Sequence, residues 1–208
     1  MTTNIIKSEE SYFSKKSIVE FLGNYGEPGT KDYEFAAALT LCHRCEQESG
    51  KECWIGFRIR RDHQKLLPTV GSQKTIGLAE VVSFLRGGID EDSYVDFSVA
   101  NLADMRKARG MKFQVKRFGI GRDKKDTDEL IAYLTKLSSK YEKSRTKLLL
   151  CLDDFVSVDF SELYTKVDFE GLPFSGVMFF WLSNGSVYIR DVFPQGGTVV
   201  YPAIDLFR

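Results

Sequence analysis

Two short polar patterns in this chain carry residue types that metal-dependent phosphodiester hydrolysis can use. Gln114 and Lys116 stand two positions apart in the alternating segment 111–118, and Asp96 stands in the preceding segment 94–100. Residues i and i+2 of a β-strand point to the same face, so Gln114 and Lys116 would lie side by side. The pattern predicts an oxygen ligand next to an ammonium group, with a carboxylate on the strand before them.

These groups suit a hard divalent cation, Mg²⁺ or Mn²⁺, which takes oxygen ligands. Asp96 would be the strongest ligand, Gln114 would add an amide oxygen, and Val115 would add its backbone carbonyl. Glu34 would bind the metal directly or through water. The metal would polarise the phosphate and activate a water. Lys116 would orient that water or stabilise the charge that develops on phosphorus.

Basic residues are concentrated around the same segment. Nine Lys and Arg side chains lie between Arg106 and Lys125, against one acid, Asp123. Such a run is typical of a solvated loop and strand edge, but it also suits a surface that holds the phosphates of a nucleic acid. The side chains assigned to that surface are Arg106, Lys107, Arg109, Lys112, Arg117 and Arg122.

Composition sets broad limits on the protein. The 208 residues suit one α/β domain. Lys and Arg together number 29, as do Asp and Glu, so the overall charge says nothing about a polyanionic partner. Without an apolar run of membrane-spanning length or a secretory signal, the chain is expected to be soluble and cytoplasmic, with no membrane partner. Four cysteines do not make a disulfide framework.

Periodicity and turn residues predict the elements that must position these side chains. Helices are expected over 9–22, 32–48, 76–85, 126–143 and 158–166. Strands are expected over 53–59, 94–100, 111–118 and 147–152, followed by a hairpin of 177–182 and 187–192 around Asn184-Gly185. This order predicts an α/β fold with a mixed sheet and helices on both faces.

The order and the residues resemble the PD-(D/E)XK nuclease superfamily, whose restriction-endonuclease-like core runs helix, three strands, helix, strand. Asp96 matches the acid of the second core strand. Gln114-Val115-Lys116 matches the third-strand motif, in a Gln-x-Lys form similar to that of methyl-directed type IV restriction enzymes. Residues 29–39, which include Tyr33-Glu34, match the first-helix pattern, and this implies Glu34 as a further site residue.

The resemblance covers roughly residues 29–155 and implies a magnesium-dependent endonuclease that acts on DNA. It places residues 61–92 as an insertion before the second core strand and 156–208 as a C-terminal extension with a β-hairpin, all in one domain over 1–208. A homodimer is compatible with this function, because such nucleases often cut two strands. No Pro precedes Asp96, and about 60 residues separate Glu34 from Asp96, so the chain departs from the family pattern in two places.

Other interpretations stay open. The same fold without catalysis would be a module that binds nucleic acid or a protein partner, of a defence or antitoxin-like kind. A structural α/β domain that assembles through its aromatic hairpin is a third. Cys42, Cys45 and Cys53 with His43 or His63 would be a zinc site, although Cys42 continues an apolar helical stripe. Asp153-Asp154, after the apolar strand, is a second carboxylate pair.

Overall fold

The computed structural model describes residues 3–6, 10–16, 18–19, 30–58, 74–75, 95–107, 109–119, 125–153 and 156–202. The chain divides into two compact units, Met1–Phe113 with Asp205–Arg208, and Gln114–Ile204. The boundary falls inside a strand rather than in a linker, so this division leaves the single-domain prediction as it stood. Each unit is described separately below.

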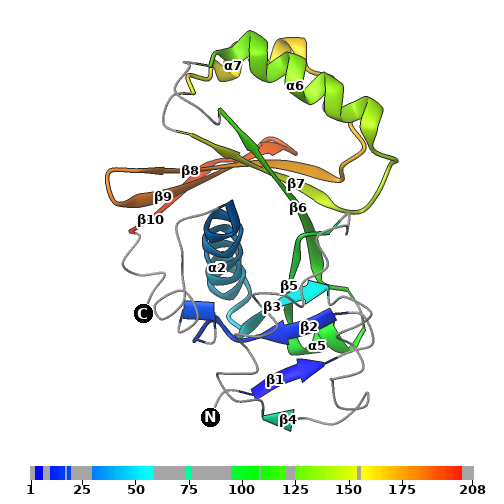
Figure 1. The fold of residues 1–208 in the computed structure, drawn as a ribbon, viewed down its shortest axis with the longest axis vertical. Helices are drawn as coiled ribbons and strands as arrows, with labels where there is room; N and C mark the ends of the chain where they lie inside the picture. Colours follow the sequence, from blue (N-terminus) through cyan, green and yellow to red (C-terminus); the bar gives the residue numbers. More distant parts are fainter. Residues whose placement is uncertain are drawn as a thin grey trace. The chain divides into compact units, whose positions relative to one another are not determined.

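The first unit combines a long helix with an antiparallel sheet (Figure 1). Helix α2 spans Thr30–Ser49 and contains the predicted segment 32–48. Its apolar residues at helical spacing, Phe35, Leu39 and Cys42, are buried. The Phe35 ring meets the ring of Phe57, on strand β3, edge-on, with centroids 5.4 Å apart.

The strands of this unit pair in the order β4-β1-β2-β3-β5-β6. All of these pairings are antiparallel. The strands are β1 (Thr3–Ile6), β2 (Glu10–Phe13), β3 (Cys53–Arg58), β4 (Lys74–Thr75), β5 (Phe97–Asn101) and the start of β6 (Met111–Phe118). Between β5 and β6 lies the short helix α5 (Leu102–Arg106), which Asn101 caps by accepting hydrogen bonds from two backbone N–H groups.

The predicted helix over 9–22 is wrong at its start, because Glu10–Phe13 forms strand β2. Tyr12 pairs with Gly56 of β3, and the Tyr12 side chain is buried. A Cβ atom on Gly56 would stand 2.7 Å from the Tyr12 ring and 2.5 Å from Ser98 Oγ. The glycine therefore makes the close strand pairing possible, a tertiary effect that local periodicity does not report.

Three further predictions concern Asp96 and the segment that precedes it. Strand β5 begins at Phe97, so Asp96 directly precedes the strand instead of lying within it. The predicted helix 76–85 lies outside the described residues. So does the predicted insertion 61–92, except for the two residues of β4, which pair with β1.

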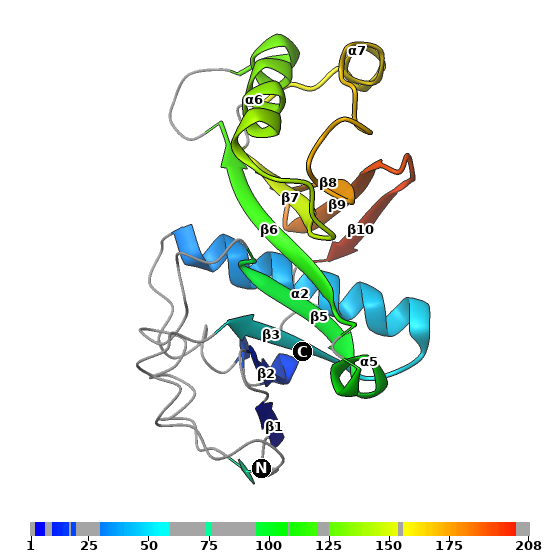
Figure 2. The same ribbon diagram turned by 90° about the vertical axis from the view of Figure 1, so that its right-hand side faces the viewer.

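The second unit is a mixed sheet with two helices on one face (Figures 1 and 2). Its strands run in the order β10-β9-β8-β7-β6, with β7 and β8 parallel and the pairs β8–β9 and β9–β10 antiparallel. The elements are α6 (Thr127–Lys140), β7 (Lys147–Leu152), α7 (Phe160–Lys166), β8 (Gly176–Ser183), β9 (Ser186–Phe193) and β10 (Thr198–Pro202). Helices α6 and α7 and strand β7 confirm three predicted elements.

One apolar core joins the helices and strands of this unit. Leu130, Leu134 and Leu137 of α6 are buried in one cluster with Leu148 and Leu150 of β7. The predicted hairpin is also confirmed, since Asn184 and Gly185 both have positive φ, 50° and 70°, as a tight hairpin turn requires. Strand β10, which pairs with β9, was not predicted.

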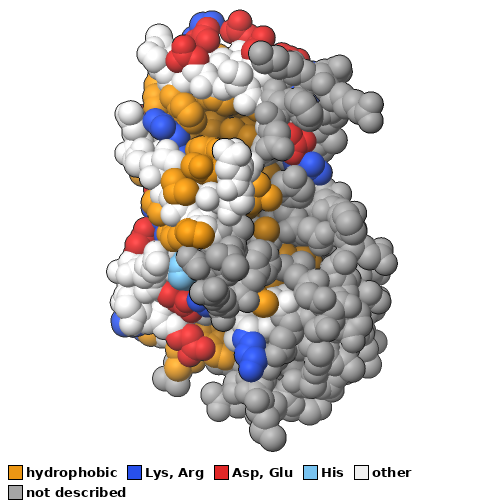
Figure 3. Space-filling model, turned by 90° about the vertical axis from the view of Figure 1, so that its left-hand side faces the viewer, with side chains coloured by type: hydrophobic (Ala, Val, Ile, Leu, Met, Phe, Trp, Pro, Cys, Tyr) orange, Lys and Arg blue, Asp and Glu red, His pale blue; other side chains and the backbone are white. Residues whose placement is uncertain are grey.

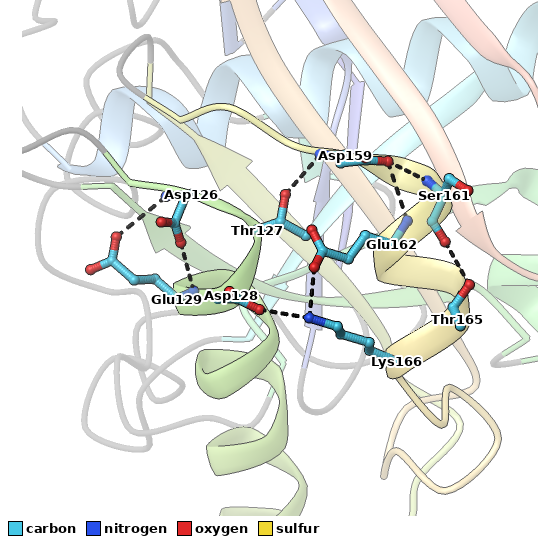
Figure 4. A network of polar contacts seen from close by, with 9 residues as sticks. All are labelled: Asp126, Thr127, Asp128, Glu129, Asp159, Ser161, Glu162, Thr165 and Lys166. Carbon is cyan, nitrogen blue, oxygen red and sulfur yellow. Dashed lines mark hydrogen bonds and ion pairs between the residues drawn. The ribbon is translucent and has the colours of Figure 1, made fainter.

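Polar contacts fix the N-terminal ends of α6 and α7 to one another (Figure 4). Asp126 forms a capping box with Glu129 at the start of α6. Thr127 Oγ1 accepts a hydrogen bond of 2.8 Å from the backbone N–H of Asp159, the residue that caps α7. These contacts hold helix α6, which carries Lys136 and Lys140, at a defined place in the second unit.

Lys166 adds a charged contact between the same helices (Figure 4). Its ammonium group lies 3.0 Å from Asp128 Oδ1 on α6 and 2.6 Å from Glu162 Oε1 on α7. Hydrogen bonds to Glu162 and Asp128 raise the pKa of Lys166.

No helix among the described residues combines the length and apolarity needed to cross a membrane. The two units together give the predicted mixed α/β class.

Candidate functional site

Asp96 is held at the point where β5 meets β6. The strands pair with Phe97 opposite Phe113 and Ser98 opposite Lys112, and the two phenylalanine rings stack with centroids 5.1 Å apart. The backbone N–H of Asp96 donates a 2.9 Å hydrogen bond to the carbonyl of Phe113. The acid is therefore tied to the residue that directly precedes Gln114 in the chain, although it lies just outside the strand.

Glu34, the other predicted acid, also belongs to the first unit. It lies in the second turn of α2, and its side chain is half-buried, as is that of Asp96. Gln114, Val115 and Lys116 belong to the second unit. The predicted convergence of the Asp96, Gln114 and Glu34 side chains and the Val115 carbonyl on one metal stays a prediction.

Strand β6 does not present a simple polar stripe. Lys112 is exposed and Lys116 half-buried, but Gln114 between them is only 4% exposed. Val115, expected on the apolar face, is buried. Burial of an amide costs free energy unless its polar atoms are hydrogen-bonded. The Gln114 side chain therefore belongs to the protein interior and not to the solvated surface.

Lys116 lines a cavity of about 260 Å³ in the second unit. Lys136 and Lys140 of α6 line it too, with the rings of Tyr133 and Tyr141. The ammonium groups of Lys116 and Lys140 each lie 5.9 Å from the centroid of the Tyr141 ring, at the outer limit of a cation–π contact. Leu137 completes the lining, which contains no carboxylate.

The charge in this cavity, which we call the lysine pocket, is not balanced by acids in the described part of the chain. None of Lys116, Lys136 and Lys140 has an ion pair among those residues. Burial, reinforced by Tyr141, raises the pKa of Tyr133 and keeps its hydroxyl protonated. The pocket therefore offers positive charge that no acid among the described residues balances, an environment suited to an anion.

Sequence reasoning missed Lys136, Lys140 and the two tyrosines as site residues. A usable signal existed, because Lys136 and Lys140 stand four apart on a predicted helix with no acid at matching spacing from either. Their proximity to Lys116 depends on how α6 packs beside β6, which only the structure provides.

The predicted nucleic-acid surface is only partly described. Lys107, Arg109 and Lys112 are exposed, all on the short connection between α5 and β6 or at its end. The side chains of Arg106 and Arg122 lie outside the described residues. These three exposed cations are the part of the surface that the structure places.

Arg117 differs from its predicted role as a phosphate contact. Its Nε lies 3.0 Å from Oδ1 of Asp153, and the two side chains are 26% and 9% exposed. A carboxylate this deeply buried needs a cation beside it, since an unpaired buried charge is strongly unfavourable. Arg117 and Asp153 therefore form a structural ion pair, and Asp153 is not a free member of a second carboxylate site.

The cysteines behave as core residues rather than as zinc ligands. Cys42 is fully buried, and the Cys53 thiol donates to the sulfur of Cys45, 3.1 Å away. Burial raises the pKa of Cys42. Burial together with the contact to Cys45 raises the pKa of Cys53 to about 12. A metal takes thiolates, which these environments disfavour. The described residues contain no group of three or more His, Cys, Asp or Glu placed to hold a metal, and His63 lies outside them.

A second cavity, of about 210 Å³, lies at the carboxyl ends of the parallel strands β7 and β8. Its lining is mainly apolar, with Leu152, Phe160 and Trp181, and the Trp181 ring stacks on Tyr188 with centroids 5.1 Å apart. On the face drawn in Figure 3, hydrophobic side chains (orange) reach the surface between backbone and uncharged side chains (white). Leu182 and Val200 are exposed large apolar residues of β8 and β10. This region lacks the positive charge of the lysine pocket.

Comparison of the chain with family models, with curated proteins and with solved structures finds no match.

Proposed function

We propose that this protein is a metal-dependent nuclease with a restriction-endonuclease-like core that hydrolyses phosphodiester bonds in DNA. The observation that carries the proposal is the pairing of β5 with β6, in which the Asp96 N–H bonds the carbonyl of Phe113. This pairing supports the proposal, because it ties the acid, directly before β5, to the residue that precedes Gln114-Val115-Lys116 in the chain. With the two-residue strand β4 and the short helix α5 set aside, the order α2, β3, β5, β6, α6, β7 supports it as helix, three strands, helix, strand.

The proposed donors fit the proposed metal. Two carboxylates, from Asp96 and Glu34, with the Gln114 amide and the Val115 carbonyl, make an all-oxygen set of the kind that Mg²⁺ or Mn²⁺ prefers. When bound, the metal would supply Lewis acidity toward a phosphate oxygen and a more acidic water. The neutral amide of Gln114 leaves such a site less negative than a third carboxylate would.

Lys116 would act on the phosphate and the water. Lys116 is half-buried and lines a pocket with no carboxylate among the described residues, so its charge would be available to an incoming anion. A positive charge placed where negative charge develops lowers the barrier by stabilising the transition state. Asp96 would orient the attacking water through the metal shell, and the exposed cations Lys107, Arg109 and Lys112 would hold the strand.

Cleavage of a labelled DNA duplex in Mg²⁺ tests this proposal. Asp96→Asn and Lys116→Ala should each lower the rate by at least about 100-fold while the far-UV circular dichroism stays unchanged. Asp128→Asn, which alters an exposed acid of α6, is the matched control and should cleave normally. Full activity of Asp96→Asn, or of the wild type in excess EDTA, would reject the proposal.

The second candidate function is a module with the same core that binds nucleic acid or a protein partner without cutting, of a defence or antitoxin-like kind. The burial of Gln114 favours it, because an interior amide is less available to a metal than a carboxylate at the surface. Metal-independent DNA binding without any cleavage, in both wild type and Asp96→Asn, would support this module over the enzyme.

A further inference from the structure

Lys136 and Lys140 form an unusual pair on α6. Residues four apart on a helix are neighbours on its surface, and like charges at that spacing repel one another. Elsewhere in the second unit the same spacing joins opposite charges, as in Lys125 with Glu129 and Glu162 with Lys166. The Lys136–Lys140 pair instead has no carboxylate partner among the described residues.

Lys116 adds a third positive charge from a different element. It lines the lysine pocket from β6, while Lys136 and Lys140 line it from α6. The centroid of the Tyr141 ring lies 5.9 Å from the ammonium groups of both Lys116 and Lys140, so one aromatic ring lies near cations from the strand and from the helix. A bound anion would relieve the mutual repulsion of the three groups.

We propose that the lysine pocket binds a phosphate group of a nucleic-acid strand, with Lys136 and Lys140 holding the phosphate beside Lys116. The assignment of the anion to a nucleic acid rests on the proposed function; the anion site itself rests on the pocket. Lys136 and Lys140 are strand-positioning residues in this arrangement, and Lys116 is the group next to the reacting phosphate.

Three properties of the pocket favour a backbone phosphate. Its volume of about 260 Å³ admits one phosphate with a few waters but no folded partner. Lys136 and Lys140 are exposed, so a long strand can run past while one phosphate enters. Lysine ammonium groups are point charges without a fixed fork geometry, which suits contact with a backbone that carries no sequence information.

Binding measured without cleavage tests the inference. Fluorescence anisotropy of a labelled 12-nucleotide DNA strand, in EDTA and over a series of salt concentrations, reports the affinity and its salt dependence. Lys136→Gln/Lys140→Gln should weaken binding by at least about tenfold at low salt. It should also reduce the slope of log K against log[salt] by about 1.4, or roughly 0.7 per lost single-strand contact.

The matched control removes the same charge from the same unit. Lys125→Gln/Lys166→Gln also deletes two lysines, but each of these already faces a carboxylate. Its affinity should stay within about twofold of the wild type, because neither lysine has free charge for a phosphate. Equal losses in both double variants would overturn the inference and indicate only an effect of net charge.

Inorganic phosphate distinguishes binding of a nucleic-acid strand in the lysine pocket from binding of a small phosphate compound. Millimolar phosphate should raise the melting temperature of the wild type and not that of Lys136→Gln/Lys140→Gln. If phosphate stabilises the wild type but the double variant binds the DNA strand normally, the assignment to a strand is overturned in favour of a small phosphate ligand. If the double variant keeps both the DNA affinity and the phosphate response of the wild type, the lysine pocket is not an anion site and the inference is overturned.

The thermal stability of the Lys136→Gln/Lys140→Gln variant also tests the inference. In phosphate-free buffer, removal of two like charges should leave the melting temperature of Lys136→Gln/Lys140→Gln equal to or above that of the wild type. A marked decrease would contradict the claim that these charges repel without a partner. Asp96→Asn in the same binding assay keeps the two proposals apart, since it should bind the strand while failing to cleave it.

Discussion

Thr127 shows what one buried hydroxyl contributes to this chain. Its side chain is 6% exposed, and its oxygen accepts the backbone N–H of Asp159 at 2.8 Å. Thr127→Val keeps the shape but leaves that N–H unpaired, so the free energy of unfolding should fall by about 1–3 kcal/mol. Urea denaturation measures the change.

Thr135→Val is the control for this prediction. Thr135 is exposed, and its hydroxyl bonds only the carbonyl of Ile131 in its own helix. Its substitution should change stability by no more than about 0.5 kcal/mol. If the two variants lose equal stability, the link between α6 and α7 is not what Thr127 provides.

Cys53 predicts a dependence of stability on alkaline pH. Its pKa is raised to about 12 in the folded protein, chiefly by burial, against about 8.5 in an unfolded chain. The folded state then keeps the proton while the unfolded state loses it. The stabilisation by the neutral thiol is therefore complete below about pH 8.5 and is lost as pH rises toward 12.

The measurement compares wild type with Cys53→Ala in the reduced state. Between pH 8.5 and 11 the free energy of unfolding of the wild type should fall more steeply than that of the variant, by at most about 1.4 kcal/mol per pH unit. Parallel curves for the two proteins would show that Cys53 does not carry this dependence.

At the scale of single residues, the sequence alone predicts Asp96 and the Gln-x-Lys motif as site residues, which stays a prediction. It also predicted strand β6, which bears the motif, whereas Asp96 lies directly before β5. The alternation places Gln114 on the same face as Lys116 but says nothing of the layer that buries the Gln114 side chain. Sequence reasoning also took Arg117 for a phosphate contact, because Asp153, its partner, is 36 residues away in sequence. Such long-range pairings are invisible to local patterns.

Gly56 constrains how strand β3 packs and not the candidate functional site. It lies on β3 between β2 and β5, where a Cβ atom would meet Ser98 Oγ at 2.5 Å and the Tyr12 ring at 2.7 Å. Gly56→Ala must push these strands apart and should lower the free energy of unfolding by about 1–3 kcal/mol. Gly197→Ala, whose Cβ would meet nothing within 4 Å, should cost far less. Thermal unfolding of both variants checks the difference.

Elements with strong local signals were predictable and those set by pairing were not. Helix α6 has a capping box and an apolar stripe, and the β8–β9 hairpin has Asn-Gly at its turn, so each follows from a few neighbouring residues. Strand β2 has a sequence compatible with a helix and becomes a strand because β3 offers it an edge next to Gly56. Strand β10 likewise depends on the edge that β9 presents.

At the scale of the whole molecule, the chain has equal numbers of basic and acidic residues, so affinity for a polyanion must come from local surfaces. Lys107, Arg109 and Lys112 supply one such surface on the first unit. Their joint replacement by Gln should reduce the slope of log K against log[salt] for duplex DNA by up to about 2.7, at roughly 0.9 per contact. A slope equal to that of the wild type would show that DNA does not touch this surface.

Strand β6 also bears on how this chain can change in length. It runs from Met111 to Phe118 through the boundary between the two compact units, and both take residues from it. Because side chains alternate along a strand, the loss or gain of one residue turns every following side chain to the opposite face. A single deletion after Lys112 would exchange the environments of Gln114 and Lys116 with those of Val115 and Arg117. These eight residues should therefore tolerate insertions and deletions poorly.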